Sequence, residues 1–333
     1  MIEVEVHQQL RAFLREQGEP YWHHHLTMAR LVARALRLGR SALIQAGAPS
    51  GYHGRYRLSY LMPLLIWQDP VVLVTPETIQ QRLLMVEIPR LRQWIPGCRE
   101  IRTGDRWQEG FQGLLLTTPR AWLSDKLAGT GHFPAEIPTL IDGADDLEHW
   151  VQDLLTVQIQ PQDWDALMQA YPHHADAIRD VRVQLTRSSF QHPVNPFDRY
   201  LIEPQEQEIL LHLYDLIKDD LLQAAPVISE SSIIPANPVI PASPVIPASV
   251  DPAIDPPSTP HPPSLVSWQL FYQAVQQEQI LWTEIARSQG SFSLHAAPNE
   301  VASHLASIWT QQPIVLIGGA LDPDSDAKIY RQR

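Results

Sequence analysis

Cysteine is nearly absent from this chain, since Cys98 is the only one among 333 residues. A single cysteine excludes an internal disulfide and a four-cysteine iron-sulfur cluster. The sequence also has no run of about 18 apolar residues and no apolar amino-terminal leader, which excludes a membrane-spanning helix and argues against secretion. We therefore expect a cytoplasmic protein with no membrane partner and no iron-sulfur cofactor.

Lysine is missing from the first 125 residues, where every basic residue other than histidine is an arginine, and neither Lys nor Arg occurs between Lys218 and Arg287. Residues 1–130 hold 16 Lys+Arg and 11 Asp+Glu, a net charge of +5, whereas the whole chain has a net charge of -12. The arginines of the basic part have two interpretations, phosphate contacts or solvated helix faces. The overall acidity argues against strong, indiscriminate nucleic-acid binding.

Proline is concentrated in residues 226–264, where the segment 235–249 repeats Pro-Ala and Pro-Val-Ile units. Proline removes backbone donors and prevents helix formation, so the segment is predicted to be a disordered, polyproline-like linker. A passive tether is one interpretation. A docking site for a protein partner with an aromatic-lined groove is the other.

Strands alternate with helices between Ala42 and Asp142, which predicts an α/β fold with a parallel sheet. After Asp145 the apolar residues recur at helical spacing, within residues 147–155 and again within 209–217. We find no strong strand signal between these two helical segments. The sequence therefore predicts a helical insertion after the sheet domain.

Two strand ends in the α/β region carry polar or small residues. The strand before Asp142 runs into an acidic turn, which puts a carboxylate at the carboxyl edge of the sheet, where Mg²⁺ could bind. The segment 43–51 runs from an apolar strand into small residues, as a phosphate loop does. A working loop needs Gly-Lys-Ser or Gly-Lys-Thr at its end, but Tyr52 follows Gly51, and an arginine does not replace that lysine well. An ordinary turn is the alternative.

With their flanking residues these motifs resemble the amino-terminal motor domain of the DinG and XPD group of superfamily 2 DNA helicases. The matching segments, in the family's order, are residues 45–63, 71–84, 114–125, 142–149 and the pair 294–302 and 313–321. The resemblance implies a RecA-like (P-loop NTPase) fold, a parallel sheet with helices on both faces and an arch-like helical insertion. It divides the chain into residues 1–145, an insertion 146–225, the linker 226–264 and the rest of the RecA-like domain, 265–333.

The resemblance also implies a set of site residues. Asp142 would be catalytic and would hold Mg²⁺, and Thr75, Arg82, Thr117 and Thr118 would contact single-stranded DNA. The residues implied for ATP are His25, which stands where the family reads adenine, together with Ala46, Gly47, Ala48, Pro49, Ser50, Gly51, Arg55 and Arg57.

The chain departs from the family pattern where the chemistry takes place. Gly143 replaces the glutamate that activates water, Asp145 replaces the box histidine, and Tyr56 and Arg57 stand in place of Lys-Thr. Residues 318–320, Gly-Gly-Ala, stand where the family has Ser-Ala-Thr. Weak or absent ATP hydrolysis is therefore predicted.

Two functions stay open. The first is a DinG-like ATP-dependent DNA helicase domain that binds ATP, Mg²⁺ and nucleic acid but lacks the second motor domain. The second is a non-catalytic scaffold or protein-interaction module derived from a helicase. The histidine pair His173 and His174 is not predicted to bind a metal, because neighbouring residues on a helix point in different directions.

Overall fold

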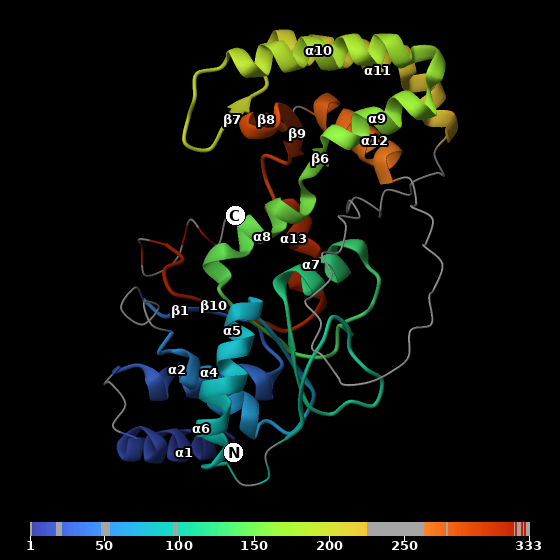
Figure 1. Cartoon of the computed structure of the whole chain (residues 1–333). Coiled ribbons are helices and arrows are strands. Elements are labelled where there is room, and N and C mark those ends of the chain that lie inside the picture. Colours follow the sequence, from blue (N-terminus) through green and yellow to red (C-terminus); the bar gives the residue numbers. More distant parts are fainter. Residues whose placement is uncertain are drawn as a thin grey trace, which may run out of the picture. The chain divides into compact units, whose positions relative to one another are not determined.

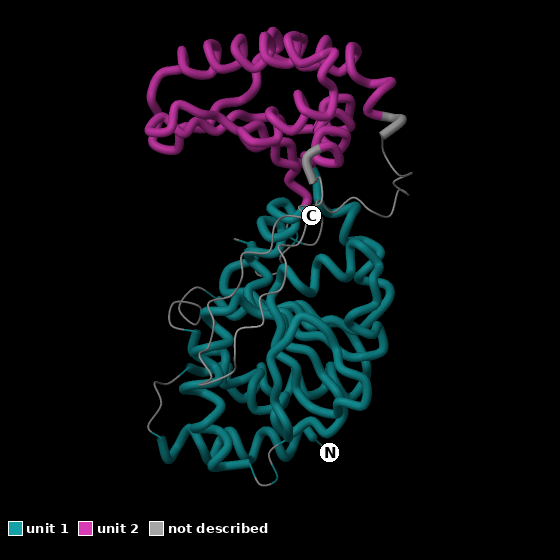
Figure 2. Tube along the Cα trace, turned by 45° about the vertical axis from the view of Figure 1, so that its right-hand side comes forward, with its two compact units in different colours: residues 1–154, 300–333 teal, residues 155–299 magenta. Residues whose placement is uncertain are grey.

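The computed structural model of the chain describes residues 2–17, 22–47, 54–95, 97, 99–224, 263–277, 279–322, 324, 328 and 330. Four predicted phosphate-loop residues (Ala48, Pro49, Ser50 and Gly51), Cys98 and residues 226–262 of the predicted linker lie outside these residues, whereas the last two linker residues, 263 and 264, belong to a helix. The chain forms two compact units: unit 1 comprises residues 1–154 and 300–333, and unit 2 comprises residues 155–299 (Figure 2).

Unit 1 contains a six-stranded sheet with the order β1-β10-β5-β2-β4-β3, in which all pairs are parallel (Figure 1). The strands β2, β4 and β5 are buried along their whole length, as expected for the inner part of a parallel sheet covered on both faces, whereas the edge strand β3 is largely exposed. The bounds of the strands in this sheet are β1 Ala42–Gln45, β2 Val71–Val74, β3 Ile101–Thr103, β4 Leu114–Thr117, β5 Thr139–Asp142 and β10 Ile314–Gly318. The predicted α/β class is confirmed, and the arrangement is consistent with a RecA-like domain.

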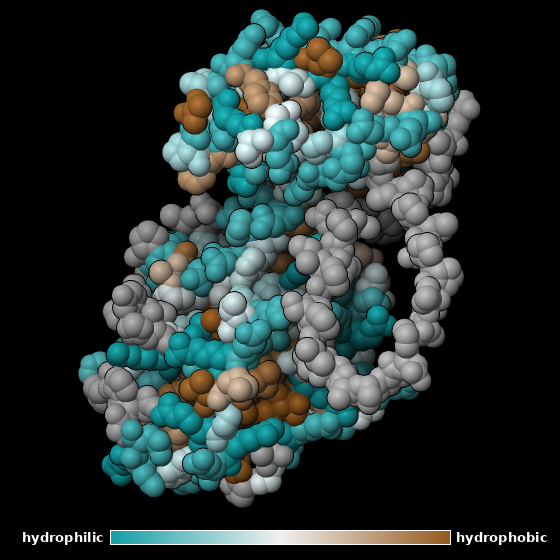
Figure 3. All heavy atoms as spheres, viewed as in Figure 1, coloured by the Kyte–Doolittle hydropathy of each residue, from teal (hydrophilic) through white to brown (hydrophobic). Residues whose placement is uncertain are grey.

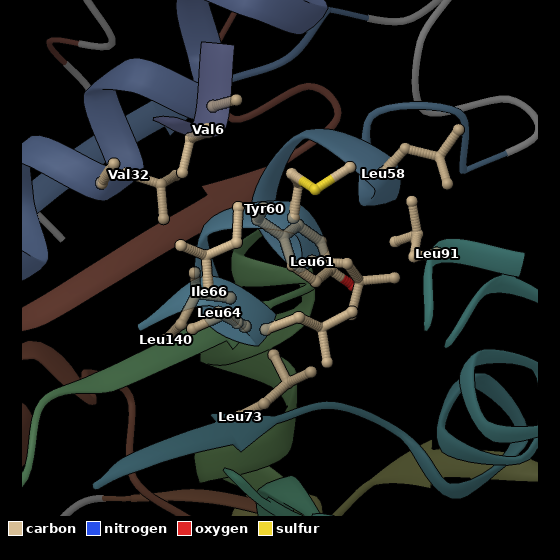
Figure 4. Packing of buried hydrophobic residues seen from close by; sticks show 14 of the residues in the cluster. Val6, Val32, Leu58, Tyr60, Leu61, Leu64, Ile66, Leu73, Leu91 and Leu140 are labelled. Atoms are coloured by element: carbon tan, nitrogen blue, oxygen red, sulfur yellow. The ribbon is translucent and has the colours of Figure 1, made fainter. Parts of the chain in front are cut away.

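Helices flank this sheet, and α1, α2, α4 and α6 share one apolar core with it. Figure 4 shows the labelled side chains of α4, among them Tyr60, Leu61 and Leu64, close to Leu73 and Leu140 of the sheet. The helices of unit 1 are α1 Ile2–Gln17, α2 His25–Leu38, α4 Arg57–Ile66, α5 Glu77–Arg82, which continues through a π-helical turn (Leu83–Glu87) into α6 Ile88–Arg92, then α7 Pro119–Ala128, α8 Leu147–Leu155 and α13 Ala302–Gln311.

Unit 2 is not purely helical. Its four-stranded sheet is antiparallel, in the order β6-β9-β8-β7, and it packs in one core with the surrounding helices. The strands are β6 Val157–Ile159, β7 Arg199–Leu201, β8 Ile280–Ala286 and β9 Ser291–Ala297, and the helices are α9 Pro161–Ala170, α10 Ala175–Gln191, α11 Pro204–Ala224 and α12 Pro263–Gln276.

Unit 2 differs from the insertion predicted from the sequence in two ways. Strands β6 and β7 lie within residues 146–225, where no strand was expected, because three-residue strands leave almost no pattern. The segment 265–299 joins unit 2, although the resemblance assigns it to the RecA-like domain. Strand β8 does carry a readable signal, since Leu281, Thr283 and Ile285 alternate inward with a period of two. None of the described helices is long and apolar enough to cross a membrane.

Candidate functional site

The carboxyl edge of the parallel sheet brings several of the predicted site residues together. Strand β5 lies between β10 and β2, with Asp142 level with Ile317 and Ile141 level with Val74. Asp142, Gly143 and Thr75 therefore meet at one edge. They contribute to a pocket of about 450 Å³ that is lined by Tyr56, Arg57, Thr75, Pro76, Thr78, Ile79, Asp142, Gly143, Asp145, Asp146, Gly319 and Ala320.

Asp142 is 1% exposed, and both of its carboxylate oxygens accept hydrogen bonds from side chains. The Tyr56 hydroxyl donates to Oδ1 at 2.6 Å. The Tyr60 hydroxyl donates to Oδ2 at 2.8 Å, and Arg57 Nε donates to the same oxygen at 3.0 Å. Arg57 thus forms a salt bridge with Asp142 and neutralises its charge. A Mg²⁺ ion at this carboxylate would have to displace these donors.

All three donors come from one short stretch of chain. Tyr56 immediately precedes α4, while Arg57 and Tyr60 lie in its first turn, at spacings that put side chains on neighbouring positions of a helix. Tyr56 and Arg57 also occupy the two positions where the resemblance expects the Lys-Thr pair. The two residues at the positions where the resemblance expects phosphate contacts therefore contact Asp142, the residue for which it implies Mg²⁺.

The titration behaviour of these groups follows from the same contacts. Burial, together with the negative charge of Asp142, raises the pKa of both Tyr56 and Tyr60, so their hydroxyls stay protonated and keep donating. Burial opposes the charge of Arg57, but attraction to Asp142 outweighs it and raises the pKa of the guanidinium. The cluster is therefore fixed as one carboxylate, one guanidinium and two neutral phenols.

Gly143, which stands where the family has its catalytic glutamate, adopts a conformation that disfavours a side chain. Its φ is +96°, in the left-handed region, and a Cβ on this residue would lie 2.9 Å from Cη2 of Trp150. The turn is held by hydrogen bonds from the Gly143 amide to the carbonyl of Ile317 and from the Asp146 amide to the carbonyl of Gly143, both 2.9 Å long. The backbone geometry of this turn therefore disfavours a glutamate at position 143.

The remaining charge of the pocket is acidic. Because Arg57 is paired with Asp142, Asp145 and Asp146 add negative charge that no other basic residue of the lining balances. Desolvation raises the pKa of Asp145, and the negative charges of Asp146 and Asp142 act in the same direction. Such a pocket repels phosphate groups.

Three further predicted ATP residues lie in places that do not favour a nucleotide. His25 is 3% exposed, and its Nδ1 lies 2.8 Å from Ser59 Oγ, so its ring is in the core between α2 and α4. The Ala46 amide donates to the carbonyl of Gly318 at 2.8 Å and extends the β1–β10 pairing. Arg55 is exposed and does not line the pocket.

The residues predicted to contact DNA make different contacts in the structure. Thr75 lines the pocket, and its buried Oγ1 has no hydrogen-bond partner among the described residues. Thr117 is buried, whereas Thr118 caps α7 by accepting a hydrogen bond from the Ala121 amide at 3.1 Å. Arg82 donates to Glu87 at 2.8 Å. DNA contact through these residues stays a prediction.

Asp142 and Arg57 were predicted as site residues from the sequence, whereas Tyr56, Tyr60 and Trp150 were not. The pair Tyr56-Arg57 at the positions expected to be Lys-Thr, with a second tyrosine one helical turn later, was the available signal for an internal hydrogen-bonded cluster around Asp142.

Comparison with known proteins gives matches among solved structures, whereas no protein-family model and no curated protein matches. An apo XPD has 14% identity and a TM-score of 0.49 over 90% of this chain and 54% of its own. An XPD helicase has 12% identity and a TM-score of 0.48 over 92% and 59%. Xpd4 of S. tokodaii has 12% identity and a TM-score of 0.46 over 91% and 58%. The chain thus spans 54–59% of the length of these structures, and the likeness concerns the general course of the chain.

Proposed function

We propose that this chain is a helicase-like domain that does not hydrolyse ATP and that serves as a protein-binding scaffold rather than a motor. The observation that supports the proposal most directly is the engagement of both oxygens of Asp142 by Tyr56, Arg57 and Tyr60. A motor of this class needs that carboxylate for Mg²⁺. Here it acts as the acceptor of an internal hydrogen-bond cluster.

The residues around Asp142 do not fit Mg²⁺ and ATP. The position of the general base is Gly143, whose φ of +96° disfavours any side chain. The Ala46 amide donates to the Gly318 carbonyl, and among the described residues that line the pocket, which include Asp145 and Asp146, the one basic side chain, Arg57, is paired with Asp142. Each of these features removes an interaction that phosphate binding or phosphoryl transfer requires.

The charge of the two units favours a protein partner over nucleic acid. Unit 1 has 19 Lys+Arg and 21 Asp+Glu, a net charge of -2, and unit 2 has 6 and 16, a net charge of -10. Figure 3 shows mainly hydrophilic residues on the visible face of α10 and α11, with single apolar side chains between them. Nucleic-acid affinity depends largely on contacts from Lys and Arg to phosphates, so an acidic chain gains little from it. The Pro-rich segment 226–264 is our candidate for the docking sequence.

The decisive experiment measures ATP hydrolysis with and without single-stranded DNA, beside titration with a fluorescent ATP analogue and Mg²⁺. The control is Asp142→Asn, which keeps the shape of the side chain and removes its charge. We expect no hydrolysis above the protein-free blank and no Mg²⁺-dependent binding that the substitution weakens. Hydrolysis that is stimulated by DNA and lost in Asp142→Asn would overturn the proposal.

A second measurement addresses nucleic acid directly, through the fluorescence anisotropy of a labelled single-stranded oligonucleotide. We expect weak binding that the Arg82→Ala substitution leaves unchanged, because Arg82 is paired with Glu87. Tight binding that falls steeply with salt and is weakened by Arg82→Ala would favour the nucleic-acid alternative instead.

A further inference from the structure

Unit 2 contains a group of three metal-ligating side chains outside the pocket of unit 1. Nε2 of His173 lies 2.8 Å from Oδ2 of Asp220, and Nε2 of His174 lies 3.4 Å from the same oxygen. The three ligand atoms lie within 4.8 Å of one another. Two imidazole nitrogens therefore face one carboxylate oxygen.

The two neighbouring histidines lie in a 3-10 turn, Pro172–His174. Their rings nevertheless lie together, with centroids 4.2 Å apart, and both Nε2 atoms approach Asp220, although neighbouring residues were expected to point in different directions. Helix α9 ends just before the turn with a hydrogen bond from the Tyr171 amide to the carbonyl of Leu167. Helix α11 packs beside α10, with Ile217 and Leu221 in the same core as Ile178. This packing brings Asp220 to the start of α10.

The distances from the two histidine nitrogens to the Asp220 oxygen suit a small transition-metal ion. Zinc binds histidine nitrogen and carboxylate oxygen at roughly 2.0–2.2 Å, so neighbouring ligands of a tetrahedral site are about 3.3 Å apart. The observed separations of 2.8 and 3.4 Å bracket that value. A set of two nitrogens and one oxygen is one that Zn²⁺ accepts, with water at the remaining position.

A second observation points to the same place. Tyr171, adjacent to the turn, is 6% exposed, and its hydroxyl has no hydrogen-bond partner among the described residues. A buried, unpartnered hydroxyl next to the turn that carries His173 and His174 is the kind of group that supports metal ligands from the outer shell.

We propose that His173, His174 and Asp220 bind Zn²⁺, which ties the turn before α10 to the end of α11. Unit 2 has a net charge of -10, which raises the local concentration of cations. The site is open to solvent, since the side chains of His173, His174 and Asp220 are 62%, 25% and 35% exposed. Unit 1 offers a matched comparison in His149 and Asp153, one turn apart on α8, where a single imidazole lies 3.3 Å from a carboxylate.

The test is a competition titration of the full, tag-free chain with Zn²⁺ and a chromophoric chelator. The variants are His174→Ala, His173→Ala and Asp220→Asn, with His149→Ala as the control. We expect one Zn²⁺ per chain, bound at least roughly ten-fold more weakly by each of the three variants and equally well by the control. Circular dichroism of each variant without metal checks that the fold is retained.

A second readout reports the ligands themselves. Co²⁺ in place of Zn²⁺ should give the visible absorption of a four-coordinate site, and Asp220→Asn should change that spectrum. Zn²⁺ should also raise the thermal transition of the wild-type chain but not that of the variants, because a ligand stabilises only the state that binds it. Zinc binding that none of the three substitutions weakens, or that His149→Ala weakens equally, would overturn the proposal, as would the absence of binding.

Discussion

Asp142 in unit 1 and Asp220 in unit 2 are both carboxylates with close polar neighbours, but the kind of neighbouring side chain differs. Asp142 is 1% exposed and accepts hydrogen bonds from two tyrosines and an arginine, which hold their protons at any ordinary pH. The side chain of Asp220 is 35% exposed and faces two imidazoles, which can lose their protons and bind a metal.

The difference shows that the position of an acidic residue does not decide its function. Asp142 stands at the carboxyl edge of a parallel sheet, where ligands usually bind, but its surroundings are filled by fixed donors. Asp220 stands on a helix in a position that no sequence motif marks, and its neighbours suit a metal ion. The function of the carboxylate depends on whether the neighbouring groups can be displaced by a ligand or can themselves bind one.

The largest expected effect is loss of stability in Asp142→Ala. This substitution leaves the Arg57 guanidinium, whose side chain is 13% exposed, without its counter-charge, and it removes the acceptor of Tyr56 and Tyr60. Breaking a buried pair in this way costs about 3–5 kcal/mol. Urea denaturation measures the loss, and hydrogen exchange in α4 and β5 assigns it to unit 1.

The control for this substitution is Asp146→Ala, which removes an exposed carboxylate from the same turn. Its effect should stay within about 0.5 kcal/mol, as for surface substitutions in general. Equal losses in the two variants would mean that the cluster around Asp142 contributes nothing special to folding.

A somewhat smaller effect is expected from acid, and it should act on unit 2. His295 is buried against Trp282, with the rings stacked at 5.1 Å, and burial lowers its pKa to about 4, while Glu284 acts in the opposite direction. As the pH falls, His295 takes up a proton near pH 6.5 in the unfolded chain but only near pH 4 in the folded chain. The contribution of neutral His295 to the free energy of unfolding is therefore fully present above about pH 6.5 and is lost as the pH drops towards 4. The total loss is about 3 kcal/mol.

Urea denaturation at pH 7.5 and pH 5, followed by hydrogen exchange in β8 and β9, checks this prediction. A His295→Gln variant lacks the titrating group and should lose less stability over the same interval. If the wild-type chain and the variant lost the same amount, His295 would not be the source of the acid sensitivity.

The next effect concerns the turn after Asp142. Gly143→Ala should destabilise unit 1 by about 1–3 kcal/mol, because φ is +96° and the new Cβ would lie 2.9 Å from Trp150. Gly129→Ala is the matched control: its φ is +64°, but a Cβ there has nothing within 4 Å. The difference between the two thermal transitions therefore reports the contact with Trp150. A larger loss in Gly129→Ala would contradict this explanation.

Part of this picture was predictable from the sequence. The apolar runs of β2, β4 and β5 and their alternation with helices predicted the parallel sheet, and the strand before Asp142 predicted the carboxylate at its edge. These signals are local, because each depends on a few neighbouring residues and their order along the chain.

The partners of Asp142 were not predictable in the same way. Tyr56 and Tyr60 lie 86 and 82 residues away in the sequence, and only the packing of α4 against the sheet brings their hydroxyls to the carboxylate. The convergence of His173 and His174 depends on a three-residue turn that no periodicity reveals. The sequence did not reveal where unit 2 begins, because β6 is recognisable as a strand only through its pairing with β9, which lies far along the chain.

The smallest expected effect is that of Asp220→Asn on the metal-free chain. The carboxylate and its nearest partner His173 are exposed to solvent, which screens their attraction, so the loss should stay below about 1 kcal/mol. Urea denaturation in the presence of EDTA measures it under the conditions used for Asp142→Ala. A loss as large as that of Asp142→Ala would mean that Asp220 also belongs to a structural cluster. A small loss of stability together with a strong loss of Zn²⁺ affinity would indicate that Asp142 stabilises the fold, whereas Asp220 binds a ligand.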